Sequence, residues 1–440
     1  MNTIKNKHGL LSLFPCLFFA IFYLGLSLWT GDFYRVPMTV AFLAASAIAV
    51  SMHPPRLFSK NISIFAKGMG NENIMLMCLV FILAGAFAAV AKGMGAVDAT
   101  INIAGKFIPQ SLILPGIFLV SCFISLAVGT SCGTIAAITP IAIGMSQKLG
   151  ITPEIMLGCV IGGAMFGDNI SMISDTTIAA TRSLNISMRD KFLSNIAFAL
   201  PAAIVTVTIY IFVKTGTAEQ VISFTSSSGS TEYLKTVPYL LILLLAICGL
   251  NVMFLLFAAA IFTVCLGVYM NIFKFMDALT ILGKGCLDMA ETLIVALLAG
   301  GLLAIVKYYG GIAWIMQKIE RTIKSSRSCE IGTAVLVSMI NLFTANNTVS
   351  IVIAGPIARE LAQKYKCSSK RIASILDTAS CIVQGVIPYG AQMLIATAIA
   401  NSNGVKVSAA KLILHCHYQQ CLLIAVLVWI ILHRKSLKSE

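Results

Sequence analysis

Residues 83–95 read LAGAFAAVAKGMG, and residues 298–310 read LAGGLLAIVKYYG. The opening Leu-Ala-Gly, an internal alanine, the lysine and the final glycine recur with one offset of 215 positions. Further identities between Ile135 and Lys148 recur between Ile351 and Lys364 with an offset of 216. Duplicated halves in an apolar chain are typical of secondary transporters, whose binding site forms where the halves meet near the bilayer midplane.

The composition is that of a membrane protein. The 440 residues are 58% hydrophobic and only 11% charged, and the mean hydropathy is +0.92. Soluble proteins carry roughly 25% charged residues, and a membrane-spanning helix needs about 20 apolar residues. Long apolar runs cover residues 11–30, 76–90, 192–213, 240–269 and 412–432. We therefore predict a polytopic protein whose surroundings are the lipid bilayer.

The net charge of +14 and the 13 cysteines have simple explanations in this setting. The basic residues flank apolar segments in short loops, where they set membrane orientation, so nucleic acid is not an expected partner. The cysteines are scattered through apolar segments without a C-x-x-C pattern, which indicates small hydrophobic residues rather than a disulfide framework.

The hydrophobic pattern predicts an all-α fold of two inverted-topology repeats. About ten transmembrane helices are expected at residues 11–30, 36–52, 73–93, 153–181, 192–214, 236–250, 252–270, 286–306, 371–399 and 408–432. Two re-entrant hairpins are expected at residues 108–150 and 327–366, with polar tips at residues 129–134 and 344–348. Backbone that leaves the helix at membrane depth is tolerated only inside protein or beside water, so the tips should face a cavity.

The domain limits and the orientation follow from this count. The first repeat spans residues 1–214, an external linker spans 215–235, and the inverted second repeat spans 236–440. Broken helices are expected at 153–181 and 371–399, near the midplane. Five crossings in the first repeat turn the second upside down and place most basic residues, Lys191 included, on the cytoplasmic side. Both termini are then cytoplasmic, in a bacterial cytoplasmic (inner) membrane. Lys274 and Lys284 do not fit this pattern.

The polar stretch at residues 162–177 interrupts an otherwise apolar segment. It contains two carboxylates, an amide and several hydroxyls, and the candidate ion-binding residues are Asp168, Asn169, Ser174, Asp175, Thr176 and Thr177. A carboxylate buried in a membrane is costly unless a cation or a proton neutralises it. Asp168 and Asp175 would share one face of a continuous helix, although these polar residues also favour a break. A purely structural role, satisfied by neighbouring hydroxyls, is the alternative.

The copy of this stretch in the second half carries fewer charges. Gln384 occupies the position of Asp168, and Ala391 that of Asp175. Neutral polar residues at the second tip, Asn346, Asn347 and Thr348, complete the candidate set. Asp377 is expected to be structural and to pair with Lys370 or Arg371. The predicted site is thus anionic on one side and neutral on the other, without a basic clamp for an anionic substrate.

At these residues the sequence resembles the NhaC family of sodium/proton antiporters, within a wider ion-transporter superfamily. The tip at residues 129–134 is similar to the family's G-T-S-W-G-T, and residues 163–177 are similar to G-A-x-F-G-D-K-x-S-P-I-S-D-T-T. The resemblance implies an ion site that includes Thr130, Ser131, Asp168, Ser174, Asp175, Thr176 and Thr177. It also implies the superfamily fold, often dimeric, so a homodimer is one expectation. Cys132, Asn169 and Met172 replace the family's Trp, Lys and Pro.

We therefore expect a Na⁺/H⁺ antiporter that works by alternating access, with Na⁺ and H⁺ as its transported ions and no cofactor. The alternative is a sodium- or proton-coupled carboxylate exchanger of the malate/lactate type. An enzymatic role is not expected. Gly167-Asp168 resembles part of the motif of intramembrane aspartyl proteases, but the Tyr-Asp partner segment of those enzymes is absent from the sequence.

Overall fold

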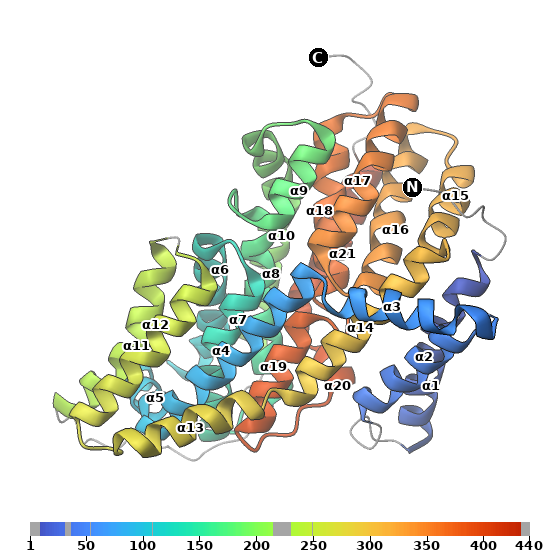
Figure 1. Cartoon of the computed structure of the whole chain (residues 1–440). Helices are drawn as coiled ribbons and strands as arrows, with labels where there is room; N and C mark the ends of the chain where they lie inside the picture. Colours follow the sequence, from blue (N-terminus) through green and yellow to red (C-terminus); the bar gives the residue numbers. More distant parts are fainter. Residues whose placement is uncertain are drawn as a thin grey trace.

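The computed structural model describes residues 9–30, 37–52, 54–107, 109–213, 230–248 and 250–432. Every element within these residues is a helix, so the predicted all-α class is confirmed (Figure 1). Most of the predicted external linker and both chain ends lie outside the described residues.

The helices up to residue 212 contain the first hairpin and the first polar stretch. They are α1 (Phe14–Thr30), α2 (Met38–Ser51), α3 (Phe58–Met69), α4 (Glu72–Met94), α5 (Ala96–Phe107), α6 (Ile113–Val128), α7 (Ser131–Leu149), α8 (Pro153–Ile170), α9 (Asp175–Leu184) and α10 (Met188–Phe212). Three short 3₁₀ turns precede α1, α3 and α6.

The helices from residue 230 onward contain the second hairpin and the copy of the polar stretch. They are α11 (Ser230–Ile247), α12 (Val252–Tyr269), α13 (Phe275–Leu287), α14 (Ala290–Tyr308), α15 (Gly311–Thr322), α16 (Ser326–Thr344), α17 (Asn347–Lys364), α18 (Ser369–Gln384), α19 (Ala391–Ser402), α20 (Ala409–Leu414) and α21 (His417–Leu432).

Helix boundaries recur at the offset seen in the sequence. The first residues of α7, α8 and α9 each lie 216 positions before those of α17, α18 and α19. The two hairpin turns also share a backbone path: Gly129 and Ala345 both have positive φ, at 72° and 48°. The next residues, Thr130 and Asn346, are extended with φ of −146° and −147°. We name α6–α7 hairpin 1 and α16–α17 hairpin 2.

Both polar stretches interrupt their helices, as predicted. Residues 171–174 separate α8 from α9, and residues 385–390 separate α18 from α19. We name these segments break 1 and break 2. Proline and glycine account for break 2, since Pro388 lacks an amide donor and Gly385 and Gly390 have no side chain to stabilise a helix.

The predicted number of ten crossings is not confirmed by helix length. Five segments of the described chain are long and apolar enough to span a bilayer, or six if the bent pair α2–α3 counts as one span. They are Glu72–Met94, Pro153–Leu184, Met188–Phe212, Val252–Tyr269 and Phe275–Tyr308. The other predicted segments are present as helices, and most of them are interrupted or shorter than 18 residues.

Four helices were not predicted: α3, α5, α13 and α15. Each is only 12 or 13 residues long, with polar residues on one face. A search for long apolar runs misses such amphipathic segments. α3 packs along α14, where Gly68 approaches Gly300, and α13 packs along α4, where Gly285 approaches Gly85.

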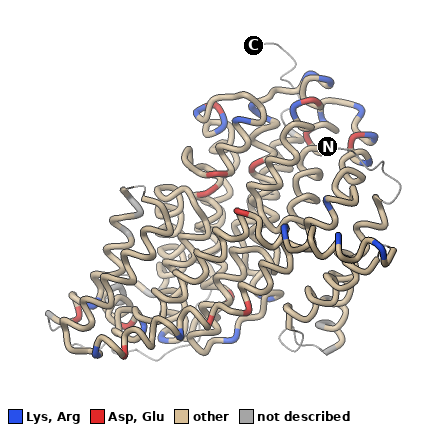
Figure 2. Tube along the Cα trace, in the orientation of Figure 1, with Lys and Arg blue, Asp and Glu red and all other residues tan. Residues whose placement is uncertain are grey.

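Charged residues are concentrated at two ends of the molecule. Figure 2 shows most Lys, Arg, Asp and Glu at the top and along the bottom edge, with a row of basic residues and a few acidic ones at mid-height. The site described next contains a buried carboxylate, which its polar neighbours must satisfy.

Candidate cation site

Break 1 is held by the hydroxyl groups of its own residues. Ser171 Oγ donates to the Leu126 carbonyl at 3.0 Å, and Thr177 Oγ1 donates to the Ser171 carbonyl at 2.6 Å. Ser174 begins α9 by accepting the backbone N–H of Thr176. These bonds satisfy backbone groups that an interrupted helix leaves open, which is why short polar side chains favour a break here.

Two glycines bring α8 close to hairpin 1. A Cβ at Gly163 would clash with the Phe118 carbonyl oxygen, and one at Gly167 would lie 2.5 Å from the Leu126 backbone nitrogen. The spacing of four residues places both glycines on one face of α8. This contact sets the position of the next residue, Asp168, relative to the tip of hairpin 1.

Asp168 is a buried carboxylate surrounded by neutral donors. It is 4% exposed. Ser174 Oγ donates to Oδ1 at 2.5 Å, while Ser131 Oγ and Asn347 Nδ2 donate to Oδ2 at 2.9 Å and 3.4 Å. Break 1 and both hairpin tips therefore converge on one carboxylate. Among the described residues, no Lys, Arg or His forms an ion pair with it.

A chain of amides extends this site to break 2. Gln392 Nε2 donates to Ser131 Oγ at 2.9 Å, and Gln384 Nε2 donates to Gln392 Oε1 at 2.7 Å. Gln384 Nε2 also donates to the Ala345 carbonyl at 3.0 Å. Gln392 was not among the predicted residues, although it lies one residue past Ala391 in the same copied stretch.

The structure brings some candidates to Asp168 and not others. Ser131, Ser174 and Asn347 contact it directly; Thr176 lies one step away, with its hydroxyl 2.9 Å from that of Ser174. Thr130 and Asn346 are the residues immediately before α7 and α17, and Asn346 Oδ1 accepts the Val349 N–H at 2.9 Å. The Thr348 backbone N–H donates to Asn347 Oδ1 at 3.0 Å, which fixes the amide that faces Asp168.

Asp175 differs from the expectation that two carboxylates would be buried on one helix face. It is exposed, at the first position of α9. Break 1 reorients the chain between the two acids, so their spacing of seven no longer puts them on a common face. An acid in the first turn of a helix is favourable for the helix dipole, which is sufficient to explain this residue.

Asn169 and Thr177 belong to a second polar cluster, which the sequence did not predict. Both bind Lys191, whose ammonium lies 2.5 Å from the Asn169 carbonyl oxygen and 2.5 Å from Thr177 Oγ1. Asn195, also on α10, donates to the Asn169 carbonyl at 2.9 Å. Lys191 is among the basic residues expected to face the cytoplasm, but its side chain is fully buried.

The expected partners of Asp377 were also wrong. Asp377 is fully buried and pairs with Lys191, with Nζ and Oδ2 2.5 Å apart. Lys370 instead pairs with Asp190 at 3.0 Å, and Arg371 binds Glu330 through two hydrogen bonds. Lys370 and Arg371 lie in the first turn of α18, whereas Asp377 lies two turns further along, so they cannot reach it.

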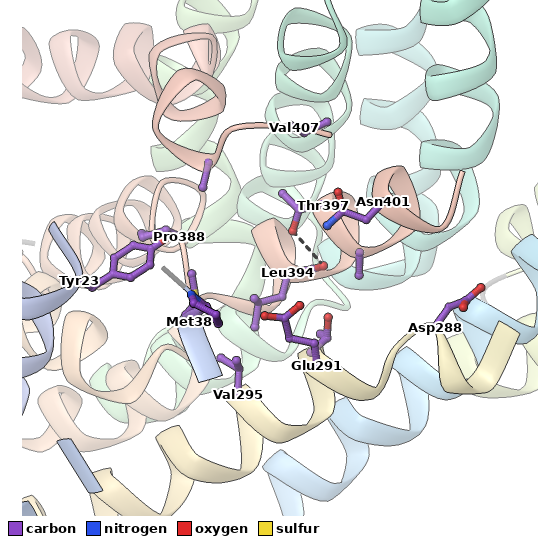
Figure 3. Close-up of a pocket in the computed structure, with 14 residues that line it drawn as sticks. Tyr23, Met38, Asp288, Glu291, Val295, Pro388, Leu394, Thr397, Asn401 and Val407 are labelled. Carbon is purple, nitrogen blue, oxygen red and sulfur yellow. Dashed lines mark hydrogen bonds between the residues drawn. The ribbon is translucent and has the colours of Figure 1, made fainter. Parts of the chain in front are cut away.

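A cavity of about 310 Å³ opens beside break 2 (Figure 3). Its lining includes Tyr23, Asp288, Glu291, Pro388, Thr397 and Asn401. In Figure 3, Glu291 points from α14 toward α19, and Asp288 lies further along the same edge. Both charged residues in this lining are acidic. Pro388, which also lines the cavity, lies in break 2 between the two hydrogen-bonded residues Gln384 and Gln392.

Comparison with known proteins assigns the chain to a family. The model of the Na⁺/H⁺ antiporter family matches residues 21–215 and 221–430. The chain is 26% identical over 351 residues to the Na⁺/H⁺ antiporter NhaC of Bacillus subtilis, covering 73% of this chain and 76% of that protein. It is 22% identical to the NhaC of Alkalihalophilus pseudofirmus, covering 81% and 82% of the two chains. It is also 22% identical to the malate-2H⁺/Na⁺-lactate antiporter of Bacillus subtilis, covering 73% and 74%.

The matched segments include both hairpins, both breaks and Asp168, and extend over nearly the whole chain. The apolar helices and this match together identify an integral membrane transporter that belongs to the Na⁺/H⁺ antiporter family.

Proposed function

We propose that this antiporter exchanges Na⁺ for H⁺ at Asp168, which binds one or the other but not both. The observation that carries the proposal is the absence of a basic partner for this buried carboxylate among the described residues. An ionised carboxylate in such a place needs a cation, and a protonated one does not. Competition for one acid makes the exchange obligatory without a covalent step, so neither an enzyme activity nor a cofactor is required.

The groups around Asp168 suit both occupants. A hydroxyl can donate to the carboxylate or rotate and offer a lone pair to a cation. Ser131 and Ser174 both donate to Asp168 in the structure and would become oxygen ligands of Na⁺ after such a rotation. Oxygen ligands with one negative charge are what a small hard cation prefers.

The architecture we propose for this mechanism is two inverted repeats, residues 1–214 and 236–440, with a linker between them. The common offset of the hairpins and breaks supports it. In this arrangement hairpins 1 and 2 are re-entrant and approach Asp168 from opposite sides of the membrane, which alternating access requires. The basic loops favour cytoplasmic termini in a bacterial inner membrane. A homodimer is compatible with this arrangement.

The proposal is tested with purified protein in liposomes that contain a pH-sensitive dye. An inward Na⁺ gradient should drive H⁺ outward in the wild type, and Asp168→Asn should abolish this movement. Glu360→Gln, which changes an exposed acid on α17, is the control and should behave like the wild type. Wild-type protein that moves no protons under a Na⁺ gradient would disprove the proposal.

Carboxylate exchange remains the second candidate because of the similarity to the malate-2H⁺/Na⁺-lactate antiporter. The site supports it less well, since an organic anion would meet Asp168 without a guanidinium or ammonium clamp. Uptake of labelled malate or lactate driven by Na⁺ or H⁺ gradients distinguishes the two candidates.

A further inference from the structure

Lys191 is enclosed by oxygen atoms in the interior of the protein. Its ammonium contacts the Asp377 carboxylate, the Asn169 carbonyl and the Thr177 hydroxyl, each at 2.5 Å. The side chains of Lys191 and Asp377 are both fully buried. An ammonium group has three N–H donors, so three oxygen acceptors satisfy it completely.

These three oxygens come from three different elements. The Asn169 carbonyl lies at the end of α8, Thr177 lies on α9 beyond break 1, and Asp377 lies on α18. Lys191 itself extends from α10. The ammonium therefore joins both sides of break 1 to a helix of the second half of the chain.

Asn195 holds this arrangement in place. Its Nδ2 atom donates to Asp377 Oδ2 at 3.1 Å and to the Asn169 carbonyl at 2.9 Å. Its Oδ1 atom accepts a short hydrogen bond from Ser374. Two of the three acceptors of Lys191, the Asp377 carboxylate and the Asn169 carbonyl, are thus held by a neighbour other than the ammonium itself.

The oxygen set around Lys191 is one that a free cation could also use. A carboxylate, a carbonyl and a hydroxyl are the ligand types that hard cations take from proteins. The set resembles the one around Asp168, where a carboxylate and two hydroxyls lie together without an ion pair among the described residues. Two carboxylates thus lie in neighbouring polar clusters, one paired with an internal cation and one without. The consecutive residues Asp168 and Asn169 link the two clusters.

We propose that Asp377, the Asn169 carbonyl and the Thr177 hydroxyl form a second cation site, which Lys191 occupies as a tethered cation. Lys191 thereby neutralises Asp377 and leaves Asp168 as the carboxylate open to a transported ion. The consequence for transport, one Na⁺ bound per chain, rests on the proposed function of Asp168. The second site itself does not depend on that function.

The test removes the tethered cation and asks whether a free one replaces it. Lys191→Ala is made in an Asp168→Asn background, so that Na⁺ binding at Asp168 does not contribute. Thermal stability in detergent is measured in NaCl, methylammonium chloride and choline chloride at equal ionic strength. We expect Na⁺ or methylammonium to raise the Tm of this variant relative to choline, which is too large for the vacated space.

The matched control adds Asp377→Asn to the same protein, which removes the negative charge of the second site. Its Tm should not depend on the choice of cation. If Lys191→Ala does not yield folded protein, Lys191→Gln is used in its place. Glutamine also removes the charge, and its side chain, which is longer than that of alanine, can still donate a hydrogen bond to Asp377. A Tm equally insensitive to the cation with and without Asp377 would overturn the proposal and leave Lys191 as a structural ion-pair partner.

Direct binding of labelled Na⁺ gives a second readout. Lys191→Ala in the otherwise wild-type chain should bind one more Na⁺ than the wild type, and Lys191→Ala/Asp377→Asn should not. If the wild type binds no Na⁺ but the Lys191→Ala protein does, the proposed function fails while the second site stands. If the wild type binds Na⁺ and every variant binds only the same amount, the second site is disproved and the proposed function of Asp168 is retained.

Discussion

The side-chain amide of Asn347 lies 3.4 Å from the carboxylate of Asp168, although the two residues are 179 positions apart in the chain. Asn347 begins the second arm of hairpin 2, and Asp168 lies at the end of α8, just before break 1. Ser131, at the same position of hairpin 1, also donates to this carboxylate. Ion binding at Asp168 can therefore affect both hairpins at once.

Removal of the Ser131 hydroxyl should weaken Na⁺ binding. Ser131→Ala deletes a donor to Asp168 and its link to Gln392. The variant also lacks the hydroxyl oxygen that would become a ligand of Na⁺, and since a polar contact to a charged group contributes about 1.5–3 kcal/mol, Na⁺ affinity should fall by roughly tenfold or more. Ser146→Ala is the control, because that buried hydroxyl of α7 bonds to the Ile151 carbonyl, away from Asp168. Equal Na⁺ affinities of the two variants, measured by calorimetry, would contradict the site.

The close approach of α8 to α6 should not tolerate a methyl group. Gly163→Ala would force a Cβ against the Phe118 carbonyl oxygen and should destabilise the protein by about 1–3 kcal/mol. Gly116→Ala, on α6, is the matched control because a Cβ there meets nothing within 4 Å. Thermal unfolding in detergent should separate the two variants, and a Tm for Gly163→Ala no lower than that of Gly116→Ala would refute this packing.

The acidic lining of the cavity beside break 2 should attract cations. Asp288→Asn/Glu291→Gln removes both charges from the lining and should lower the apparent affinity of transport for Na⁺ at low ionic strength. The difference should shrink when choline chloride screens the charges. Glu360→Gln again serves as the control, since Glu360 is an exposed acid that does not line this cavity. An effect of equal size at all salt concentrations would argue against an electrostatic origin.

Cys367 should be a reactive thiol near neutral pH. It lies in the loop between α17 and α18, where the neighbouring Cys329 thiol lowers its pKa to about 7. Because the thiolate is the reactive form, alkylation of Cys367 should accelerate as the pH rises through about 7 and level off above it. Cys329→Ala removes the largest cause of the shift, so the midpoint should move to higher pH.

Mass spectrometry of the alkylated peptide measures this rate for Cys367 in both proteins. Cys248, an exposed thiol elsewhere in the chain, provides an internal reference for the pH dependence of the reagent. The same midpoint for Cys367 with and without the Cys329 thiol would contradict this effect of Cys329 on the pKa of Cys367.

Much of the fold could be predicted because the signals are local. Gly129, the polar residues around Asp168 and the glycines near Pro388 mark the turns and breaks directly, and the offset of 216 transfers the assignment from one half to the other. The short helices α3 and α15 could not be found in this way, because their polar faces interrupt the apolar runs on which the prediction depended.

The second polar cluster could not be predicted for a different reason. Lys191 follows Arg189 and Asp190 in what looks like a basic loop before a transmembrane helix. Asp190 remains partly exposed and pairs with Lys370, whereas the adjacent Lys191 points inward to Asp377. The packing of α10 against α18 determines whether Asp190 or Lys191 is buried, and no local sequence pattern indicates that contact.

Gln384 stands at the position of Asp168 in the copied stretch, and its amide donates to the carbonyl of Ala345. Ala345 has a φ of 48°, a left-handed conformation that costs a residue with a Cβ about 1–2 kcal/mol. An ionised acid at position 384 could not donate this bond. The amide at this position therefore stabilises a strained turn of hairpin 2. One copy of the stretch carries the negative charge, and the other supplies the hydrogen bond that holds the backbone of the hairpin.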